Sequence, residues 1–306
     1  MGCASKLASW MVAAGLSLVP AASLANPYDI SLRGLGRPDP QLGLDDPAAK
    51  RYRALSSELA LALAPRPLAP AETLGMSGFE FSLVNTLADI SANQPYWQGQ
   101  PGEPVLEGAL ANHGGRSVPS VFWIPSVHLR KGLPMSTEIG INGSYLAYSD
   151  MFFMGAEAKV ALHESYFRYA PALTFRTAFG RLFGSSDLDM FTFEADGITS
   201  LAFGVGGMAQ LTPYLGYGVM FAHVNSQVID ETPYSVRDGN DQKGGPEGSL
   251  YTFPTVNWSE NQHMRIFGGL RINIAMFELL YEFDLGQVKF NHKQLLSHSF
   301  KIGFDV

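Results

Sequence analysis

The 306-residue chain has a single cysteine, Cys3, close to its amino end. The remainder of the chain therefore cannot form an internal disulfide. No stretch beyond the first 25 residues offers the ~20 consecutive apolar residues that a membrane-spanning helix requires. Lysine and arginine total 21 against 28 aspartate and glutamate, giving a formal net charge of −7. This balance argues against nucleic acid as a partner, because phosphate binding requires a basic face.

Motifs that carry enzymatic chemistry are also missing. The sequence contains no spacing typical of metal ligands, no phosphate-binding glycine loop and no nucleophile elbow. We therefore expect neither a metal ion nor a cofactor.

Residues 1–25 have the pattern of a secretory signal peptide. Lys6 is their only charge, Leu7–Leu18 is a short apolar run, and Ser23-Leu24-Ala25 offers a small-x-small cleavage site. The apolar run is too short to span a membrane, although a buried N-terminal helix is an alternative. An exported chain without spanning helices is periplasmic, secreted or an outer-membrane barrel.

Alternation of apolar and polar residues is the strongest pattern in the chain. The last segment places Phe300, Ile302, Phe304 and Val306 on one face and Ser299, Lys301, Gly303 and Asp305 on the other. A sheet with one face rich in Phe, Tyr, Leu and Gly and the other carrying full charges is typical of a transmembrane β-barrel. Such a barrel has lipid outside and a polar lumen. The mean hydropathy near zero agrees, since alternation dilutes the apolar residues.

The pattern predicts an all-β, antiparallel, up-and-down barrel of about ten strands, with eight or twelve as alternatives. Strands are expected to start near Ser77, Pro119, Ser136, Met151, Ala170, Leu188, Ala209, His263, Ala275 and Ser297. The first and seventh connections, Leu87 to Val118 and Asn225 to Gln262, are the long ones. Barrels have short periplasmic turns and long outer loops, so these odd-numbered connections are expected outside.

Residues 26–74 differ in composition from the barrel expected over 75–306. Asp46-Pro47 is a good helix start, and Tyr52, Leu55 and Leu59 then fall on one helical face. Prolines 65 and 67 end the helix. We expect a periplasmic segment with a short amphipathic helix, which plugs the barrel mouth, contacts a partner or only links; the linker is favoured.

Period two also predicts which charged side chains point into the lumen. Charges on the lipid face would cost ~2–4 kcal/mol each near the midplane, so the polar face is the inner one. The predicted lumen residues are His128, Arg130, Glu157, Lys159, Arg176, Glu194, Asp196, Arg265, Arg271, Glu278, Glu282 and Lys301. Their signs alternate between neighbouring strands, which favours an ion-pair network that fills a narrow barrel. A narrow polar pore or a solute site is the alternative.

Aromatic residues near the expected strand ends fit the belts that flank a membrane. They are Trp123, Tyr145, Tyr148, Tyr214, Tyr217 and Tyr281. Core aromatics of a soluble sandwich would give similar numbers.

The signal peptide, the alternating strands and the ending Phe300-Lys301-Ile302-Gly303-Phe304-Asp305-Val306 resemble small Gram-negative outer-membrane barrels as a class. The resemblance covers about residues 75–306. It implies contact with outer-membrane lipid and insertion by the barrel-assembly machinery, which reads the last strand. The class usually ends in an aromatic residue, from which Val306 departs. An extracellular ligand at the long connections is a further possible partner.

Ten strands is also the count of the omptin proteases, which carry Asp/His pairs at the outer rim. Four residues are expected near that level: Asp187, Asp189, His223 and His263. His223, however, falls on the outward-facing side of the alternation in its strand. The adjacent pair His298-Ser299 would point to opposite faces. We therefore expect no enzyme but a structural or surface-interacting barrel, with a narrow channel second and an omptin-like enzyme third.

Overall fold

The computed structural model describes residues 26, 28–99, 108–110, 118–164, 170–205, 209–230, 250–288, 290 and 293–305. The predicted signal peptide (1–25) and Val306 lie outside the described residues, as do parts of both long connections.

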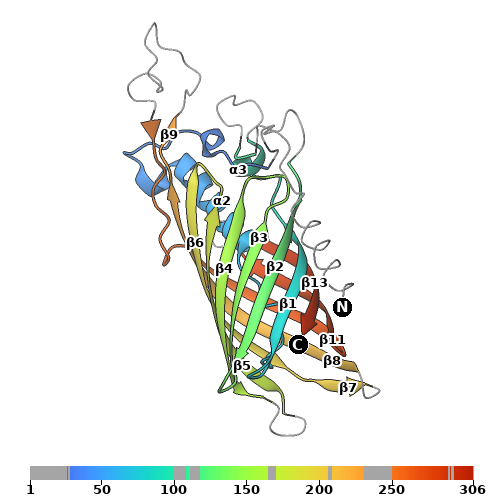
Figure 1. The fold of residues 1–306 in the computed structure, drawn as a ribbon. Coiled ribbons are helices and arrows are strands. Elements are labelled where there is room, and N and C mark those ends of the chain that lie inside the picture. Colours follow the sequence, from blue (N-terminus) through green and yellow to red (C-terminus); the bar gives the residue numbers. More distant parts are fainter. Residues whose placement is uncertain are drawn as a thin grey trace, which may run out of the picture.

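Ten strands form one closed antiparallel barrel (Figure 1). They are β1 (Phe79–Asp89), β2 (Val121–Leu133), β3 (Thr137–Tyr145), β4 (Phe152–His163), β5 (Ala172–Phe183), β6 (Leu188–Ser200), β8 (Ala209–Ser226), β11 (Gln262–Ile274), β12 (Phe277–Gln287) and β13 (Gln294–Asp305). Each strand pairs with its neighbour in this order, and the pairing of β13 with β1 closes the sheet. The expected up-and-down barrel is thereby confirmed.

Three short strands lie outside this ring. β7 (Phe203–Val205) is an extra strand that pairs with β8, and β9 (Ile229–Asp230) pairs with β10 (Leu250–Tyr251) in a separate two-stranded sheet. All ten expected strand starts correspond to observed ones, and the largest difference is the three residues between Ser297 and Gln294.

Buried and more exposed residues alternate along most of the barrel strands, and β11 departs from this pattern where Phe267 and Gly268 are both buried. In β1, Phe79, Phe81 and Leu83 are exposed on the outer face, whereas Glu80 and Ser82 are buried inside. Successive side chains of a strand point to opposite faces, so the sequence pattern translates directly into an apolar exterior and a polar interior.

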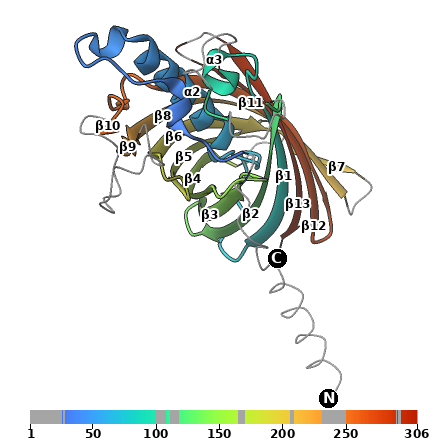
Figure 2. The ribbon, with the colours of Figure 1, turned by 90° about the horizontal axis from the view of Figure 1, so that it is seen from above.

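The two ends of the barrel differ (Figures 1 and 2). The long connections between β1 and β2 and between β8 and β11 both leave the end that carries α2 and α3. The opposite end has tight turns, in which Met135, Ser136 and Ala275 adopt positive φ angles of 62°, 52° and 54°. Two-residue hairpin turns require such left-handed backbone. We call these ends the long-connection end and the short-turn end.

The part of the chain that the structure describes has four helical elements, which precede or interrupt the strands: η1 (Leu32–Leu35), η2 (Gly43–Asp45), α2 (Pro47–Leu63) and α3 (Pro95–Gln98). The Asp46 side chain caps α2, since its Oδ1 accepts hydrogen bonds from the backbone N–H groups of Ala48 and Ala49 at 2.7 and 2.9 Å. Pro47 occupies the first turn, as predicted. Within the described ranges, no helix has the length and apolar character needed to cross a membrane.

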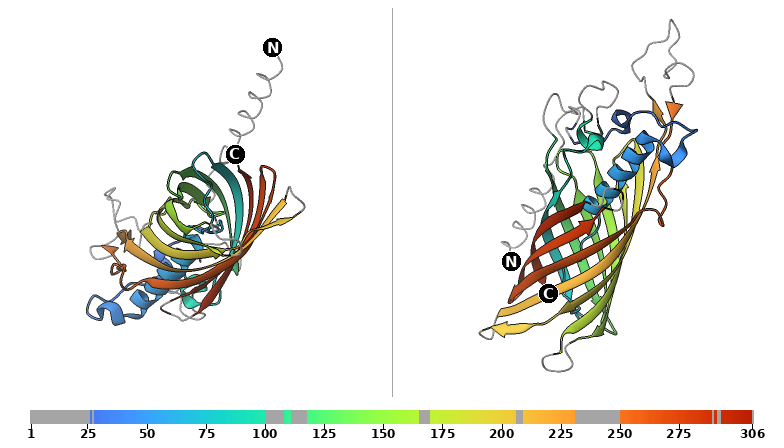
Figure 3. Two further views of the ribbon diagram at one scale, coloured as in Figure 1. Left: turned by 90° about the horizontal axis from the view of Figure 1, so that it is seen from below. Right: turned by 180° about the vertical axis from the view of Figure 1, so that it is seen from behind.

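The segment from α2 to β1 runs through the barrel from one end to the other. Near the long-connection end, the rings of Tyr52 and Phe253 stack at 4.8 Å, and Ser57 Oγ donates to Asn261 Oδ1 at 2.6 Å. Residues 64–74 continue along the lumen without regular secondary structure, and β1 starts at the short-turn end (Figure 3). The favoured linker interpretation is therefore wrong, because the segment fills the lumen instead of leading up to it.

Two apolar clusters pack around this segment. The larger joins α2 with α3 and the strands near the long-connection end. The smaller lies within the lumen and consists of Leu68, Ala71, Val84, Ala172, Ile198, Tyr214, Phe267 and Leu280. Segment residues belong to both clusters, so the segment and the barrel share one core.

Candidate functional site: the occupied lumen

All twelve predicted lumen residues lie on the inner face of the barrel. Eleven are buried as whole residues, and the side chain of the twelfth, Glu157, is only 8% exposed. What these residues do there depends on how they contact one another and the threaded segment.

Lys301 of β13 joins the two strands beside it. Its Nζ lies 2.6 Å from Glu80 Oε1 of β1 and 2.8 Å from Glu278 Oε1 of β12. One ammonium thus neutralises carboxylates on both sides of its own strand.

Glu157 of β4 joins two arginines. Arg130 Nε of β2 lies 2.6 Å from its Oε1, and Arg176 Nη2 of β5 lies 2.7 Å from its Oε2. The contact with Arg130 passes over β3, where Gly140 leaves the necessary space: a Cβ at Gly140 would lie 2.9 Å from Glu157 Oε1.

Arg265 of β11 continues the same arrangement across β8. It lies 3.0 Å from Glu194 of β6 and pairs with Asp284 of β12, while Arg176 pairs with Asp196 of β6. A glycine again marks the crossing, since a Cβ at Gly218 of β8 would lie 1.9 Å from Asp196 Oδ1.

The pairs form a circuit around the whole circumference. In order it passes through Glu278, Lys301, Glu80, Arg130, Glu157, Arg176, Glu194, Arg265 and Asp284. It starts and ends on β12, and each cation stands between carboxylates. Buried charges are tolerated when they are paired and hydrogen-bonded in this way.

Two cations of the circuit, together with Lys159 of β4, also bind the threaded segment. Arg130 donates to the carbonyl oxygens of Pro67 and Leu68, and Lys301 Nζ donates to that of Leu68 at 2.9 Å. Lys159 Nζ donates to the carbonyl of Glu72 at 2.8 Å. A segment without regular secondary structure cannot satisfy its own backbone, so these side chains supply the partners that a helix or sheet would otherwise provide.

Side-chain oxygen atoms of the lumen accept hydrogen bonds from the backbone N–H groups of the same segment. Glu282 Oε2 accepts from the N–H of Leu68 at 3.0 Å, and Ser200 Oγ accepts from that of Ala71 at 3.0 Å. Glu138 Oε2 accepts from the N–H of Leu74 at 3.2 Å. Donors and acceptors of the lumen therefore match those of the segment along its length.

Several lumen charges were not among the predicted twelve. Glu80 and Glu138 share the inward parity of their strands, so period two could have found them. Arg66 and Glu72 belong to the threaded segment; Glu72 lies 2.9 Å from Arg271 of β11. No periodicity marks an irregular, proline-containing segment, so the sequence carries no comparable signal for these two.

Asp187 and Asp189, which were expected at the outer rim, contact different partners. Asp187 Oδ2 accepts from the backbone N–H of Leu32 at 2.8 Å, which ties the N-terminal region to the end of the barrel. Asp189 pairs with Arg181 at 3.3 Å on the outside.

The rim histidines point in different directions. His223 lies on the outer face, as its parity predicts, and its ring stacks on Trp258 at 5.6 Å. His263 is buried inside, where its Nε2 lies 2.6 Å from Asn261 Oδ1. These four residues are therefore not assembled as Asp/His pairs. In the described part of the chain, no group of three or more His, Cys, Asp or Glu is placed to hold a metal ion.

The pair His298-Ser299 is split between the two faces. His298 Nδ1 lies 2.8 Å from the hydroxyl of Tyr281 on the outside, and Ser299 Oγ lies 2.9 Å from Thr86 Oγ1 inside. A strand cannot bring neighbouring side chains together, so the two do not form a Ser/His pair.

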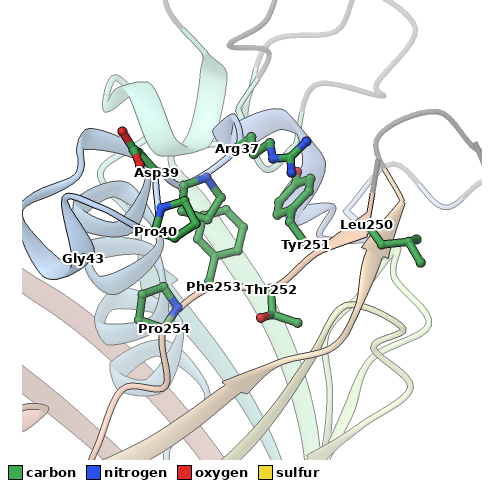
Figure 4. A pocket seen from close by; sticks show the side chains of 10 residues that line it. Arg37, Asp39, Pro40, Gly43, Leu250, Tyr251, Thr252, Phe253 and Pro254 are labelled. Carbon is green, nitrogen blue, oxygen red and sulfur yellow. The ribbon is translucent and has the colours of Figure 1, made fainter. Parts of the chain in front are cut away.

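A cavity of about 430 Å³ opens at the long-connection end (Figure 4). It is lined by Arg37, Pro38, Asp39, Pro40, Gly43, Leu250, Tyr251, Thr252, Phe253 and Pro254. The Arg37 guanidinium lies 6.0 Å from the centroid of the Tyr251 ring. The cavity thus combines an apolar, proline-rich wall with one cation and one carboxylate.

The barrel exterior is a continuous apolar surface. Exposed on it are Phe81, Leu83, Ile139, Ile141, Phe175, Phe179, Leu279, Phe300, Ile302 and Phe304. The prediction that Tyr214 belongs to an aromatic belt at the membrane surface is wrong. Tyr214 is buried in the lumen, where its hydroxyl donates to Glu282 at 2.6 Å. The closed sheet, apolar outside and charged inside, defines an antiparallel transmembrane β-barrel of the outer-membrane type.

Solved structures with a similar fold are outer-membrane barrels. The N-terminal β-barrel domain of Pseudomonas aeruginosa OprF is 11% identical, with a TM-score of 0.29 over 76% of this chain and 99% of that one. The attachment invasion locus protein Ail of Yersinia pestis is 10% identical, with a TM-score of 0.28 over 76% and 99%. LpxR from Salmonella typhimurium is 13% identical, with a TM-score of 0.32 over 73% and 99%.

These likenesses concern the fold alone. No family model matches the chain, and no curated protein matches it. The closed antiparallel barrel itself confirms the expected class of fold, and contact with membrane lipid follows from its apolar exterior.

Proposed function

We propose that the protein is an integral outer-membrane barrel whose lumen is closed by its own N-terminal segment, and that it acts structurally or through its surface. The observation that carries this proposal is the threading of residues 64–74. Lumen arginines and lysines bind their carbonyl groups, and lumen carboxylates and hydroxyls bind their amides. A solute would have to displace a segment whose backbone groups are already paired.

The orientation in the membrane is part of the proposal. Barrels place long loops outside and short turns in the periplasm, so the long-connection end faces outward. Residues 28–46 and the start of α2 lie at that end, where Leu32 binds Asp187 and Tyr52 stacks on Phe253. We accordingly place the beginning of the 26–74 segment outside the cell and not in the periplasm. Recognition of β13 by the barrel-assembly machinery completes the proposed route.

Surface interaction is supported by the cavity between residues 37–43 and 250–254. It joins the N-terminal region to the second long connection, so both contribute to one exposed face. An extracellular ligand or partner would bind at this face.

Labelling of single cysteines on intact cells tests the orientation. The mature chain (residues 26–306) has no cysteine, because Cys3 lies in the predicted signal peptide. Leu42 is 54% exposed at the long-connection end, and Met135 is 92% exposed in a turn of the short-turn end. A membrane-impermeant maleimide should label Leu42→Cys on intact cells and Met135→Cys only after the outer membrane is permeabilised.

Each variant serves as the control for the other, because both positions are exposed and lie outside the strands. Labelling of Met135→Cys but not Leu42→Cys on intact cells would reverse the proposed orientation. Labelling of neither before permeabilisation, with both labelled afterwards, would place the protein in another compartment.

A further inference from the structure

The hydrogen-bonded ladder between β2 and β3 has a gap toward the long-connection end of the barrel. β2 pairs with β1 at Pro125, opposite Asn85, but it pairs with β3 only from Ser126 and Ser144 onward. Proline has no N–H to donate and is unusual in a central strand. Contact resumes beyond the gap, where the N–H of Ala147 donates to the carbonyl of Trp123 at 3.0 Å.

A groove of about 460 Å³ lies at this gap. Leu83, Val127, Tyr145 and Phe152 form its apolar walls. Gly143 leaves it open, because a Cβ built there would meet nothing within 4 Å. The volume is within the range of small-molecule sites, and the groove is part of the surface that faces lipid.

Asn85 is an outward-pointing polar residue in this lipid-facing groove, whereas Ser126 and Ser144, which also line it, belong to the inward-facing positions of their strands. Asn85 points outward from β1, and its Oδ1 accepts a hydrogen bond from Trp123 Nε1 at 3.1 Å. Within the described residues, the amide nitrogen of Asn85 has no hydrogen-bond partner, and water is absent at this surface in a membrane. A polar group in hydrocarbon requires a hydrogen-bond partner.

We propose that this groove binds one acyl chain of a membrane phospholipid, with an ester carbonyl of that lipid accepting a hydrogen bond from the Asn85 amide. The apolar walls fit the hydrocarbon chain. Trp123 lies beside the groove and Tyr145 lines it on the long-connection side, and Trp and Tyr are enriched at the headgroup level. The ester groups of a bilayer lie just below that level, where Asn85 stands.

A bound lipid fits the site better than a second copy of the chain. The strands on both sides of the gap, β2 and β3, are each paired with both of their neighbours, so the sheet offers no free edge for another chain at this place. The inference rests on insertion of the barrel into a membrane, but it does not depend on a closed lumen.

Native mass spectrometry of the mature protein released from phosphatidylethanolamine vesicles tests the site. The wild type should retain one phospholipid. Gly143→Leu places a side chain in the groove, where its Cβ meets nothing within 4 Å, and should reduce the lipid-bound fraction about tenfold. Asn85→Leu removes the amide but keeps the volume, and should reduce that fraction about three- to tenfold.

The matched control is Gly204→Leu in β7, because a Cβ at Gly204 also meets nothing within 4 Å. Lipid retention by this variant should equal that of the wild type. Equal retention by the Gly143→Leu and Gly204→Leu variants, or none by the wild type, would overturn the proposal; a dimer without lipid would assign the groove to a second copy. Heat-modifiable migration in gels shows whether each variant has folded. The closed lumen is tested by a separate experiment, channel recording.

Discussion

Single arginines in the lumen each contact more than one carboxylate. Arg176 is the clearest case, because its guanidinium pairs with Glu157, Glu194 and Asp196 and is only 2% exposed. Removing one partner of a buried ion pair leaves an uncompensated charge and costs ~3–5 kcal/mol. We expect Arg176→Met to lose at least this much stability in urea unfolding from lipid vesicles.

The control for that variant is Arg181→Met. Arg181 pairs with Asp189 at 3.3 Å on the exposed side of the barrel, where ion pairs contribute ~0–1 kcal/mol. Similar losses in the two arginine variants would show that the circuit does not stabilise the barrel.

Two glycines allow the circuit to cross strands that contribute no charge to it. Gly218→Ala would place a methyl group against the Asp196 carboxylate and displace it from Arg176. Such overpacking costs ~1–3 kcal/mol. We expect this loss in the same unfolding experiment, with the midpoint shifted to lower urea.

Gly143→Ala provides the comparison, since its new methyl group meets nothing within 4 Å. Its stability should stay within ~0.5 kcal/mol of the wild type, as at other unconstrained surface positions. A loss for Gly143→Ala as large as that for Gly218→Ala would assign the effect to glycine flexibility and not to the Asp196 contact.

At the scale of elements, α2 depends on a buried carboxyl group. Glu58 accepts hydrogen bonds from the Tyr96 hydroxyl at 2.6 Å and from the N–H of Ser91, both in the first long connection beyond the strand ends. Burial raises the pKa of Glu58 above its ordinary value of 4.5, although these hydrogen bonds oppose the shift.

The direction of that shift sets a pH dependence. A carboxyl whose pKa is raised in the folded state favours the fold while it is protonated, and that contribution is lost as the pH rises through the folded pKa. Attachment of α2 to α3 should therefore weaken as the pH rises above 4.5, and hydrogen exchange of α2 should speed up. Glu58→Gln should remove this dependence. Equal pH profiles for wild type and variant would contradict the assignment.

The strands could be predicted from sequence, whereas the path of the N-terminal segment could not. Period two is a local property, so β1 and β13 and the inward side of Arg176 or Lys301 follow from neighbouring residues alone. The helix start at Asp46-Pro47 is equally local. Residues 64–74 have no repeating pattern, and their place in the lumen depends on Arg130, Lys159 and Lys301 from distant strands.

At the scale of the whole molecule, the chain closes its own barrel. Arg130, Lys159 and Lys301, on three strands, bind the segment backbone. Arg130 and Lys301 also belong to the charge circuit around the wall. The ion-pair network expected from alternating charges is thus half of the arrangement, and the threaded segment is the other half. Together they leave the exterior to lipid and the long-connection end as the exposed face.

The most direct test of this account is single-channel recording of the refolded mature protein, residues 26–306, in a planar bilayer. The closed lumen predicts a folded, heat-modifiable protein that inserts and passes no discrete current at low or high salt. Discrete steps whose size grows with salt, recorded from the intact chain, would contradict the central claim. In that case the segment would not block the lumen, and the charged circuit would line an open channel.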